Sequence, residues 1–489
     1  MVRRGPRLAL LVLLSGLLAP APSARRPSLP EDPPLLPPAG GPRFEGDFEA
    51  RLRTAPADRH VQALLDLGDQ VDVALLSERL RAAGRDKRAR RQAVVGALER
   101  VAQRQQALLQ PLVARLLADR SLVRVDRVAI VNRLVVEGTA AGVLALASRP
   151  EVARVLPEWT SFPGAGGGEP AQAPALGERF RSWAVDAVGA SPLWAEGLDG
   201  RGVVVAALDT GVDGGHEQLR GRRLPGARGW FDPEGGSSDP YDLHGHGTSV
   251  LSQAVGGGVP ERVVGIAPGA RWAAGLANWN NQYSRVRMTL AADWVLRAAR
   301  PDVLVNAWSH DEGACPGFDL PFLRAWRAAE IFVVFPAGNA GPSPRSGEAP
   351  AQLPGAFAVG GLARTGEPLR ASSRGPSACG DQLFPALAAP AADLPFAFPA
   401  GERAYLAGDG TSLAAAVVAG GAALLLQAAP ELGPAELEEI LRESARDVPP
   451  EGPDATTGAG ALDLTQALSL ARGRGRSVRQ RDRAVGLEP

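Results

Sequence analysis

Residues 203–213, VVVAALDTGVD, decide the fold of the larger part of this chain. Their apolar run is typical of a buried strand, and it ends in an acid, Asp209, followed by a turn. Later in the chain come further short apolar runs, at 303–306, 331–335 and 356–359. Segments typical of helices lie between or after them, at 287–299, 320–329, 413–429 and 434–444. Apolar strands that alternate with helices predict an α/β fold, a mainly parallel twisted sheet with helices on both faces.

Three side chains in this region are candidates for chemistry. Asp209 ends a strand, and sites form at the carboxyl ends of parallel strands. Residues 244–250, HGHGTSV, place His246 between glycines at the start of an apolar helix. Residues 408–420, GDGTSLAAAVVAG, place Ser412 at the start of another. A serine there is usually only a helix cap, but the helix N-terminus also offers N–H groups and a positive dipole end to an oxyanion.

The order Asp, His, Ser with these flanks resembles the subtilisin-like serine peptidases, and within them most closely the bacillopeptidase F-like members. The resemblance covers about 183–471 and is carried by these motifs: Asp209-Thr210-Gly211-Val212, His246-Gly247-Thr248, Pro336-Ala337-Gly338-Asn339, Ser372-Ser373-Arg374-Gly375-Pro376 and Gly410-Thr411-Ser412. It implies a serine endopeptidase that works through an acyl-enzyme. The implied triad is Asp209, His246 and Ser412, with Asn339 in the oxyanion hole. Leu413 stands where the family usually has Met, a swap that removes no catalytic group.

The same resemblance implies where a substrate binds. Ala307, Trp308, Ser309 and Gly338 are expected to line the cleft. Glu348, two residues before a proline, is expected near the floor of the primary specificity pocket. A carboxylate there favours Arg or Lys in the substrate. Two alternatives stay open: Glu348 points to water, or the pocket is apolar and accepts large hydrophobic side chains.

The segments ahead of the expected peptidase domain (182–471) indicate an exported precursor. Residues 1–24 have the charged start, short apolar core and small residues of a secretory signal peptide, so we expect a secreted protein, extracellular or periplasmic, without a permanent membrane span. A Pro-rich linker (25–43), a small domain (44–160) and a second linker with the probable maturation region (161–181) follow. The basic tail, 472–489, is expected to be frayed and solvated.

Residues 44–160 predict a small α+β domain. Strand-like runs at 71–76, 124–136 and 152–156 alternate with helical stretches at 88–117 and 138–148. The domain resembles the ferredoxin-like, inhibitor-type propeptide of the same family, especially at 130–132 and 135–139. The resemblance implies a zymogen whose own propeptide is an intramolecular inhibitor.

Composition bears on the partners of the protein, on the state of its two cysteines and on cofactors. A formal net charge of zero over 489 residues gives no argument for a nucleic-acid partner, so the expected partners are protein or peptide substrates and the propeptide. Cys315 and Cys379 are either one disulfide or two buried thiols. The mechanism requires no cofactor; structural calcium is possible in this family, but no ligand cluster could be assigned. The competing interpretation is a weak or inactive subtilisin-fold peptide-binding protein, and retention of the triad argues against it.

Overall fold

The computed structural model describes residues 32–37, 40, 43–161, 176–279, 282–310, 315 and 317–484. The predicted signal peptide, 1–24, lies outside the described residues. Parts of both predicted linkers, including 162–175, and the last five residues, 485–489, also lie outside them.

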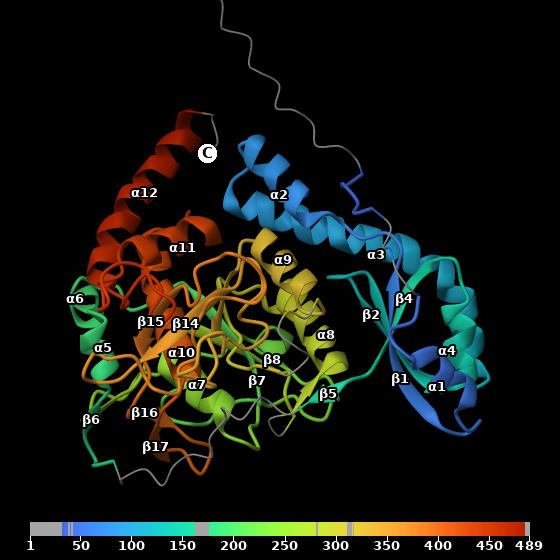
Figure 1. The fold of residues 1–489 in the computed structure, drawn as a ribbon, viewed down its shortest axis with the longest axis horizontal. Helices are drawn as coiled ribbons and strands as arrows, with labels where there is room; N and C mark the ends of the chain where they lie inside the picture. The colour runs from blue at the N-terminus through green and yellow to red at the C-terminus, as the bar shows by residue number, and fades with distance from the viewer. Residues whose placement is uncertain are drawn as a thin grey trace, which may run out of the picture. The chain divides into compact units, whose positions relative to one another are not determined.

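The larger domain is built on a seven-stranded sheet in the order β15-β14-β13-β12-β7-β10-β8. Figure 1 labels β15, β14, β7 and β8 of this sheet. The described strand pairings in it are all parallel, which confirms the α/β prediction. β10 was not expected, because its sequence RWAAGL is poor in the β-branched residues that mark strands. It is held by pairing with β7 along its whole length. The strands are β7 (Val204–Asp209), β8 (Trp230–Phe231), β10 (Arg271–Leu276), β12 (Val303–Val305), β13 (Phe332–Pro336), β14 (Phe357–Leu362) and β15 (Leu387–Pro390).

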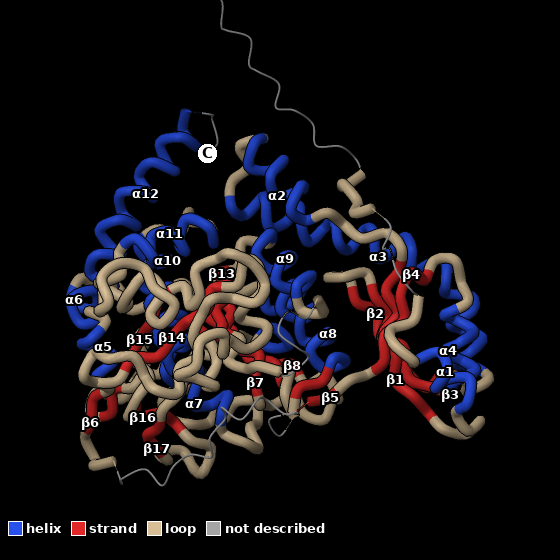
Figure 2. The backbone as a smooth tube through the Cα atoms, viewed as in Figure 1, coloured by secondary structure: helices blue, strands red, loops and turns tan. Residues whose placement is uncertain are grey.

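Helices pack on both faces of this sheet. Alternate residues of β7 and β12 join α7 (His246–Val255) and α10 (Thr411–Ala428) in one core cluster. Successive residues of a strand point to opposite faces. Helices α8 (Arg285–Trp294) and α9 (Leu320–Ala328) contribute nothing to that cluster and contact β10 and β13 instead. Figure 2 shows these helices around the strands.

Helix α10 is the centre of the core, as the sequence predicted. It is the one helix among the described residues long and apolar enough to cross a membrane, but 83 % of its length is buried inside the protein. Its start therefore has a rigid support, which matters because the predicted nucleophile lies there.

The amino-terminal domain has a four-stranded antiparallel sheet in the order β2-β3-β1-β4. This order, with helices in the two crossovers, is the ferredoxin-like arrangement that was predicted. The strands are β1 (His60–Leu67), β2 (Leu122–Val128), β3 (Arg133–Thr139) and β4 (Val152–Pro157). The helices are α1 (Phe48–Thr54), α2 (Val73–Ala82), α3 (Lys87–Ala118) and α4 (Ala140–Ala147).

The predicted strand at 71–76 is wrong, because this run begins α2. Asp72 caps the helix by accepting a hydrogen bond from the Leu75 N–H at 2.9 Å. Leu76 and Leu80 are buried one helical turn apart. A six-residue apolar run fits a strand or a buried helix equally well by periodicity, so only the tertiary packing decides. The first strand of the domain is β1 instead, and the run at 124–136 contains parts of two strands.

The predicted frayed tail is also wrong for 472–484, which continue helix α12 (Leu464–Ala484). Arg474 ties this helix to α11 (Pro434–Glu443) by ion pairs with Glu439 at 2.7 Å and Glu443 at 2.6 Å.

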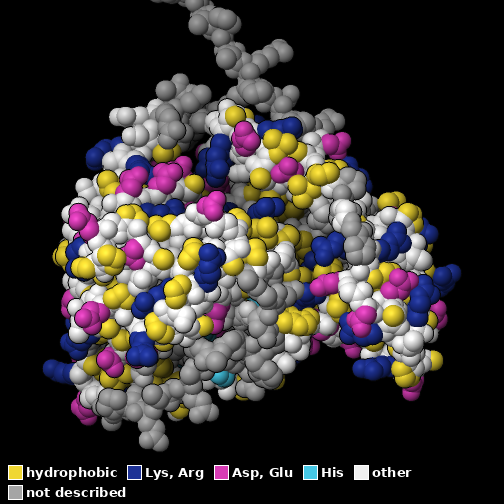
Figure 3. All heavy atoms as spheres, viewed as in Figure 1, with side chains coloured by type: hydrophobic (Ala, Val, Ile, Leu, Met, Phe, Trp, Pro, Cys, Tyr) yellow, Lys and Arg dark blue, Asp and Glu magenta, His cyan; other side chains and the backbone are white. Residues whose placement is uncertain are grey.

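The remaining elements are β5 (Thr160–Ser161), β6 (Phe180–Arg181), α5 (Trp183–Ala187), α6 (Ala190–Ala195), η1 (Gly226–Arg228), β9 (Arg262–Val263), β11 (Tyr283–Ser284), η2 (Val295–Ala299), β16 (Leu394–Ala397) and β17 (Tyr405–Gly408). Basic and acidic side chains are interspersed over the face in Figure 3, in keeping with the balanced charge.

Candidate active site

The carboxyl end of β7 brings an acid and a histidine together. Asp209, the last residue of β7, is 2 % exposed. Its Oδ1 lies 2.7 Å from Nδ1 of His246, the first residue of α7, and also accepts the N–H of Thr210 at 2.7 Å. A buried acid fixed in this way orients the imidazole so that Nδ1 carries the proton and Nε2 is the basic nitrogen.

Two glycines let α7 begin close to β7. Gly245 has a φ of +95°, and a Cβ there would lie 2.4 Å from the ring of Phe398. A Cβ on Gly247 would lie 2.1 Å from the carbonyl oxygen of Gly211 and 3.0 Å from Cβ of Asp209. A side chain at either position would force the start of α7 away from β7, so the glycines are part of the site.

A second acid, Asp242, supports the pair, and the sequence did not single it out. It is 9 % exposed. Oδ1 accepts the Thr210 hydroxyl at 2.9 Å and the Gly245 N–H at 2.8 Å. Oδ2 accepts the Thr248 N–H at 2.9 Å and its hydroxyl at 2.7 Å. One carboxylate thus joins the loop after β7 to the start of α7. It belongs to no motif, so only its three-dimensional position reveals it.

The two histidines of the HGHG segment titrate in opposite directions. Burial acts to lower the pKa of His246, but the charge of Asp209 and its hydrogen bond outweigh burial and the pKa is raised. The pKa of His244 is lowered, first by burial and then by the charge of His246. The two rings lie 6.3 Å apart between centroids. His246, which directly precedes Gly247-Thr248, is the one of the two that bonds to Asp209.

The start of α10 places Ser412 beside Asn339. The Ser412 hydroxyl donates to the carbonyl oxygen of Ala307 at 3.3 Å. Thr411 donates to Oδ1 of Asn339 from its N–H and from its hydroxyl, each at 3.0 Å. With Oδ1 facing Thr411, the amide nitrogen of Asn339 lies on the other side of the group. The site therefore combines a hydroxyl, a side-chain amide and the N-terminus of a buried helix.

The segment that follows β12, residues 306–310, forms a wall next to Ser412. The Ala307 carbonyl accepts its hydroxyl, as described above. The Trp308 side chain is only 5 % exposed and packs against Tyr283 and Phe335, with ring centroids 5.5 and 6.2 Å away. This indole therefore belongs to the packing behind the wall.

Glu348 lies against two residues that were predicted to line the cleft, Ser309 and Gly338, and against the predicted oxyanion residue, Asn339. A Cβ on Gly338, which has a φ of +109°, would lie 2.7 Å from Oε2 of Glu348. The carboxylate accepts hydrogen bonds from the Ser309 hydroxyl and the Asn339 backbone N–H, which act to lower its pKa. Burial has the larger effect and raises the pKa of Glu348. A half-buried carboxylate thus lies between Asn339 and the wall.

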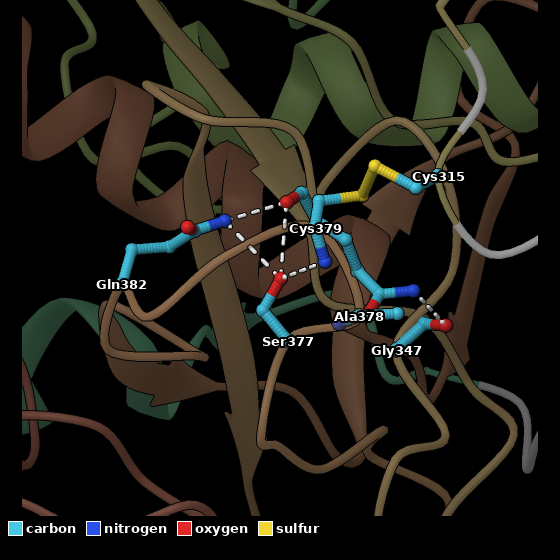
Figure 4. Close-up of a disulfide and its surroundings, with 7 residues drawn as sticks. Cys315, Gly347, Ser377, Ala378, Cys379 and Gln382 are labelled. Atoms are coloured by element: carbon cyan, nitrogen blue, oxygen red, sulfur yellow. Dashed lines mark hydrogen bonds between the residues drawn. A yellow bond between two sulfur atoms is a disulfide. The ribbon is translucent and has the colours of Figure 1, made fainter.

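The two cysteines form a disulfide, which decides between the two alternatives left open (Figure 4). It joins Cys315, beyond the wall, to Cys379, with Cα atoms 5.3 Å apart. The Cys379 loop is bound to Gln352, whose Oε1 accepts the Ala378 N–H at 2.7 Å. The Gln352 amide donates to the carbonyl oxygen of Gly347 at 2.6 Å. The disulfide therefore supports the loop that carries Glu348.

Within the described ranges, no group of three or more His, Cys, Asp or Glu side chains could hold a metal ion. The arrangement that does exist is an acid, a base, a hydroxyl and an amide at the carboxyl edge of a parallel sheet. Such a set is suited to nucleophilic attack on a carbonyl group.

Comparisons with known proteins agree with this reading of the chemistry. The model of the subtilase family matches residues 200–460. The chain is 33 % identical to bacillopeptidase F of Bacillus subtilis over 317 residues, which are 59 % of this chain and 22 % of that protein. It is 27 % identical to fervidolysin of Fervidobacterium pennivorans over 58 % of this chain and 43 % of that protein. It is 30 % identical to the serine protease AprX of Bacillus subtilis over 55 % of this chain and 67 % of that protein. The chain thus spans less than half the length of the first two relatives.

Proposed function

Because the chain belongs to the subtilase family of serine proteases, we propose that it is a secreted endopeptidase, made as a zymogen, with Asp209, His246 and Ser412 as its triad. The observation that carries the proposal is the 2.7 Å contact between Asp209 and His246 at the end of β7. The neighbouring strand, β12, leads into Ala307, whose carbonyl oxygen accepts the Ser412 hydroxyl. Its substrates are peptide bonds of proteins.

The mechanism follows from the role that each side chain can take. His246 Nε2 takes the proton of the Ser412 hydroxyl as the oxygen attacks the scissile carbonyl carbon. Asp209 stabilises the imidazolium that forms. The Asn339 amide and the Ser412 N–H stabilise the tetrahedral oxyanion. The imidazolium then protonates the leaving amine, and water hydrolyses the acyl-enzyme by the same steps in reverse order.

The direct test uses a serine-directed fluorophosphonate probe on the mature protein. We expect the wild type to be labelled, and Ser412→Ala to be unlabelled and to accumulate as intact precursor. Loss of the nucleophile should lower the peptidase rate by about 10⁴–10⁶. Wild-type activity in this variant would exclude the triad. An unlabelled and inactive wild type would favour the competing interpretation, a peptide-binding protein on the same fold.

The inhibitor role of residues 44–160 is supported at the end of the amino-terminal domain. Strand β5 pairs antiparallel with β11, and Trp159, just before β5, packs on the rings of Tyr283 and His310, each 5.9 Å away. Glu158 accepts the Val286 N–H at the start of α8 at 2.8 Å. The segment thus lies along the wall that continues from Ala307. Added in trans at micromolar concentration, this domain should slow hydrolysis of a peptide by the mature enzyme.

Secretion rests on the signal-like composition of residues 1–24. N-terminal sequencing of the mature protein from the medium or periplasm should give a start within the second predicted linker, 161–181. A mature protein that retains 44–160 and is fully active would contradict the zymogen.

The proposed mechanism itself uses no metal, so adding a chelator should leave the initial rate of peptide hydrolysis unchanged. A chelator that lowers only the melting temperature would indicate structural calcium.

Primary specificity is proposed to come from Glu348. Its burial and its contacts with Ser309 and Asn339 support a carboxylate within reach of a bound substrate side chain. A buried carboxylate favours a guanidinium or ammonium partner through charge-assisted hydrogen bonds. Cleavage after Arg or Lys is therefore expected over cleavage after Phe.

A further inference from the structure

Several helices of the peptidase domain end close together at the edge of the sheet opposite the triad. The α8–η2 helix ends at Ala299, ahead of β12, and α9 ends at Ala328, ahead of β13. Helix α10 ends nearby, at Ala428. Each helix C-terminus has carbonyl oxygens without intrahelical partners and the negative end of a dipole. The amino ends of β12 and β13 are therefore bordered by a concentration of carbonyl oxygens.

The carbonyl oxygens at 300–301, 329–330, 430 and 432, together with Glu330, form a socket. Basic side chains from the first turns of α3 bind in it. Arg91 donates to the carbonyl oxygens of Ala329 at 2.9 Å, Pro301 at 3.0 Å, Glu330 at 3.1 Å and Arg300 at 3.2 Å. Lys87 donates to those of Pro430 at 3.2 Å and Leu432 at 2.8 Å. The N-terminus of α3 adds its own positive dipole end. Charge and dipoles are thus complementary across this contact.

A buried acid lies in the middle of the socket. The side chain of Glu330 is 0 % exposed, and Arg90 of α3 donates to both of its oxygens, at 2.6 and 3.1 Å. Burial of a carboxylate is unfavourable unless a cation and hydrogen bonds compensate for it. The peptidase domain therefore presents an acid whose buried state depends on a guanidinium from the amino-terminal domain.

We propose that this socket, defined by Glu330 and the carbonyl oxygens at 300–301, 329–330, 430 and 432, is a second anchoring site for the propeptide. Its ligand is the arginine- and lysine-bearing N-terminus of α3. The first anchor is the β5–β11 segment beside the active site. The second lies at the opposite edge of the sheet, so cutting the linker after β5 does not disturb it. It holds the cut propeptide on the enzyme and sets the rate of release.

This inference rests on the proposed inhibitor role, and one set of variants tests both. Arg90→Ala/Arg91→Ala removes the basic pair, whereas Arg88→Ala is the matched control, because Arg88 is exposed on the same turn. After self-processing of the full chain, size-exclusion chromatography and the recovery of peptidase activity are followed over time. In the wild type and the control, the cut propeptide should co-elute and activity should rise slowly. In the double variant, release should be at least about tenfold faster.

The outcomes separate the two proposals. Equal release rates in the double variant and the control, or immediate separation in the wild type, would overturn the second anchor. Full activity while the propeptide still co-elutes would overturn the inhibitor role instead and leave the anchor standing.

If the double variant does not fold, Arg91→Lys decides, because it keeps the charge but loses the fork that reaches several carbonyl oxygens. Hydrogen exchange in the uncut Ser412→Ala chain provides the second measurement. Amides of the second and third turns of α3 should exchange faster with Arg91→Lys than with Arg88→Lys. Identical exchange in the two variants would overturn the anchor.

Discussion

Asp242 accepts two hydrogen bonds from Thr248, one from its N–H at 2.9 Å and one from its hydroxyl at 2.7 Å. Its other oxygen, Oδ1, accepts the Thr210 hydroxyl at 2.9 Å, so Asp242 fixes the first turn of α7 to the loop that follows β7. The position of His246 therefore depends on an acid whose hydrogen bonds go to its neighbours, among them Thr210, Gly245 and Thr248. Asp242 is a positioning residue, and its charge also contributes to the raised pKa of His246.

We expect Asp242→Asn to lower kcat by about 10–100-fold with little change in KM, because small displacements of a catalytic base are costly. The amide keeps the shape of the carboxylate but cannot accept all of its hydrogen bonds. Asp239→Asn is the control, since Asp239 lies in the same loop with an 86 % exposed side chain. Steady-state kinetics on one peptide substrate measure both. An unchanged kcat for Asp242→Asn would show that α7 holds its place without this acid.

The acid limb of the pH profile should report on His246. Only the neutral imidazole can act as base, and its pKa is raised, so kcat/KM should fall as the pH drops through a value above the usual histidine pKa of about 6.5. Asp209→Asn removes the charge that raises the pKa, so the limb of the residual activity should move to lower pH. A limb that stays in place in this variant would assign it to another group.

Site residues that lie within short motifs could be predicted from the sequence. Residues that position the site through contacts between distant segments could not. Asp209 and His246 were found because each carries its own flanking residues, and the parallel sheet brings them together. Asp242 has no flanking pattern, and its role depends on contacts with two separate loops. The run at 71–76 was assigned wrongly because a short apolar segment does not define its own period, and burial beside α3 made it a helix.

The disulfide between Cys315 and Cys379 is expected to stabilise the folded state. It closes a loop over a sequence separation of 64, and loop-closure entropy then predicts about 4 kcal/mol of unfolding free energy. The double variant Cys315→Ser/Cys379→Ser should lose about this amount in denaturant unfolding monitored on the inactive Ser412→Ala chain. The same chain with both cysteines, measured with and without reductant, is the control. A loss below about 1 kcal/mol would mean that the native loops hold each other without the bond.

The last prediction concerns Glu348 and combines specificity with pH. Wild type should cleave after Arg faster than after Phe in matched peptides, and Glu348→Gln should reduce that ratio by about tenfold or more, because it removes a half-buried charge. Glu367→Gln, at an exposed position, should leave the ratio unchanged. Burial raises the pKa of Glu348, so its negative charge is lost as the pH falls, at a value above the usual carboxylate pKa of about 4.3. The preference for cleavage after Arg should therefore weaken as the pH is lowered toward that value. The rate of cleavage after Phe should depend only on the protonation of His246. A wild-type preference for Phe, or an equal ratio in both glutamine variants, would assign the pocket to apolar side chains and leave Glu348 with only its contacts to Ser309 and Asn339.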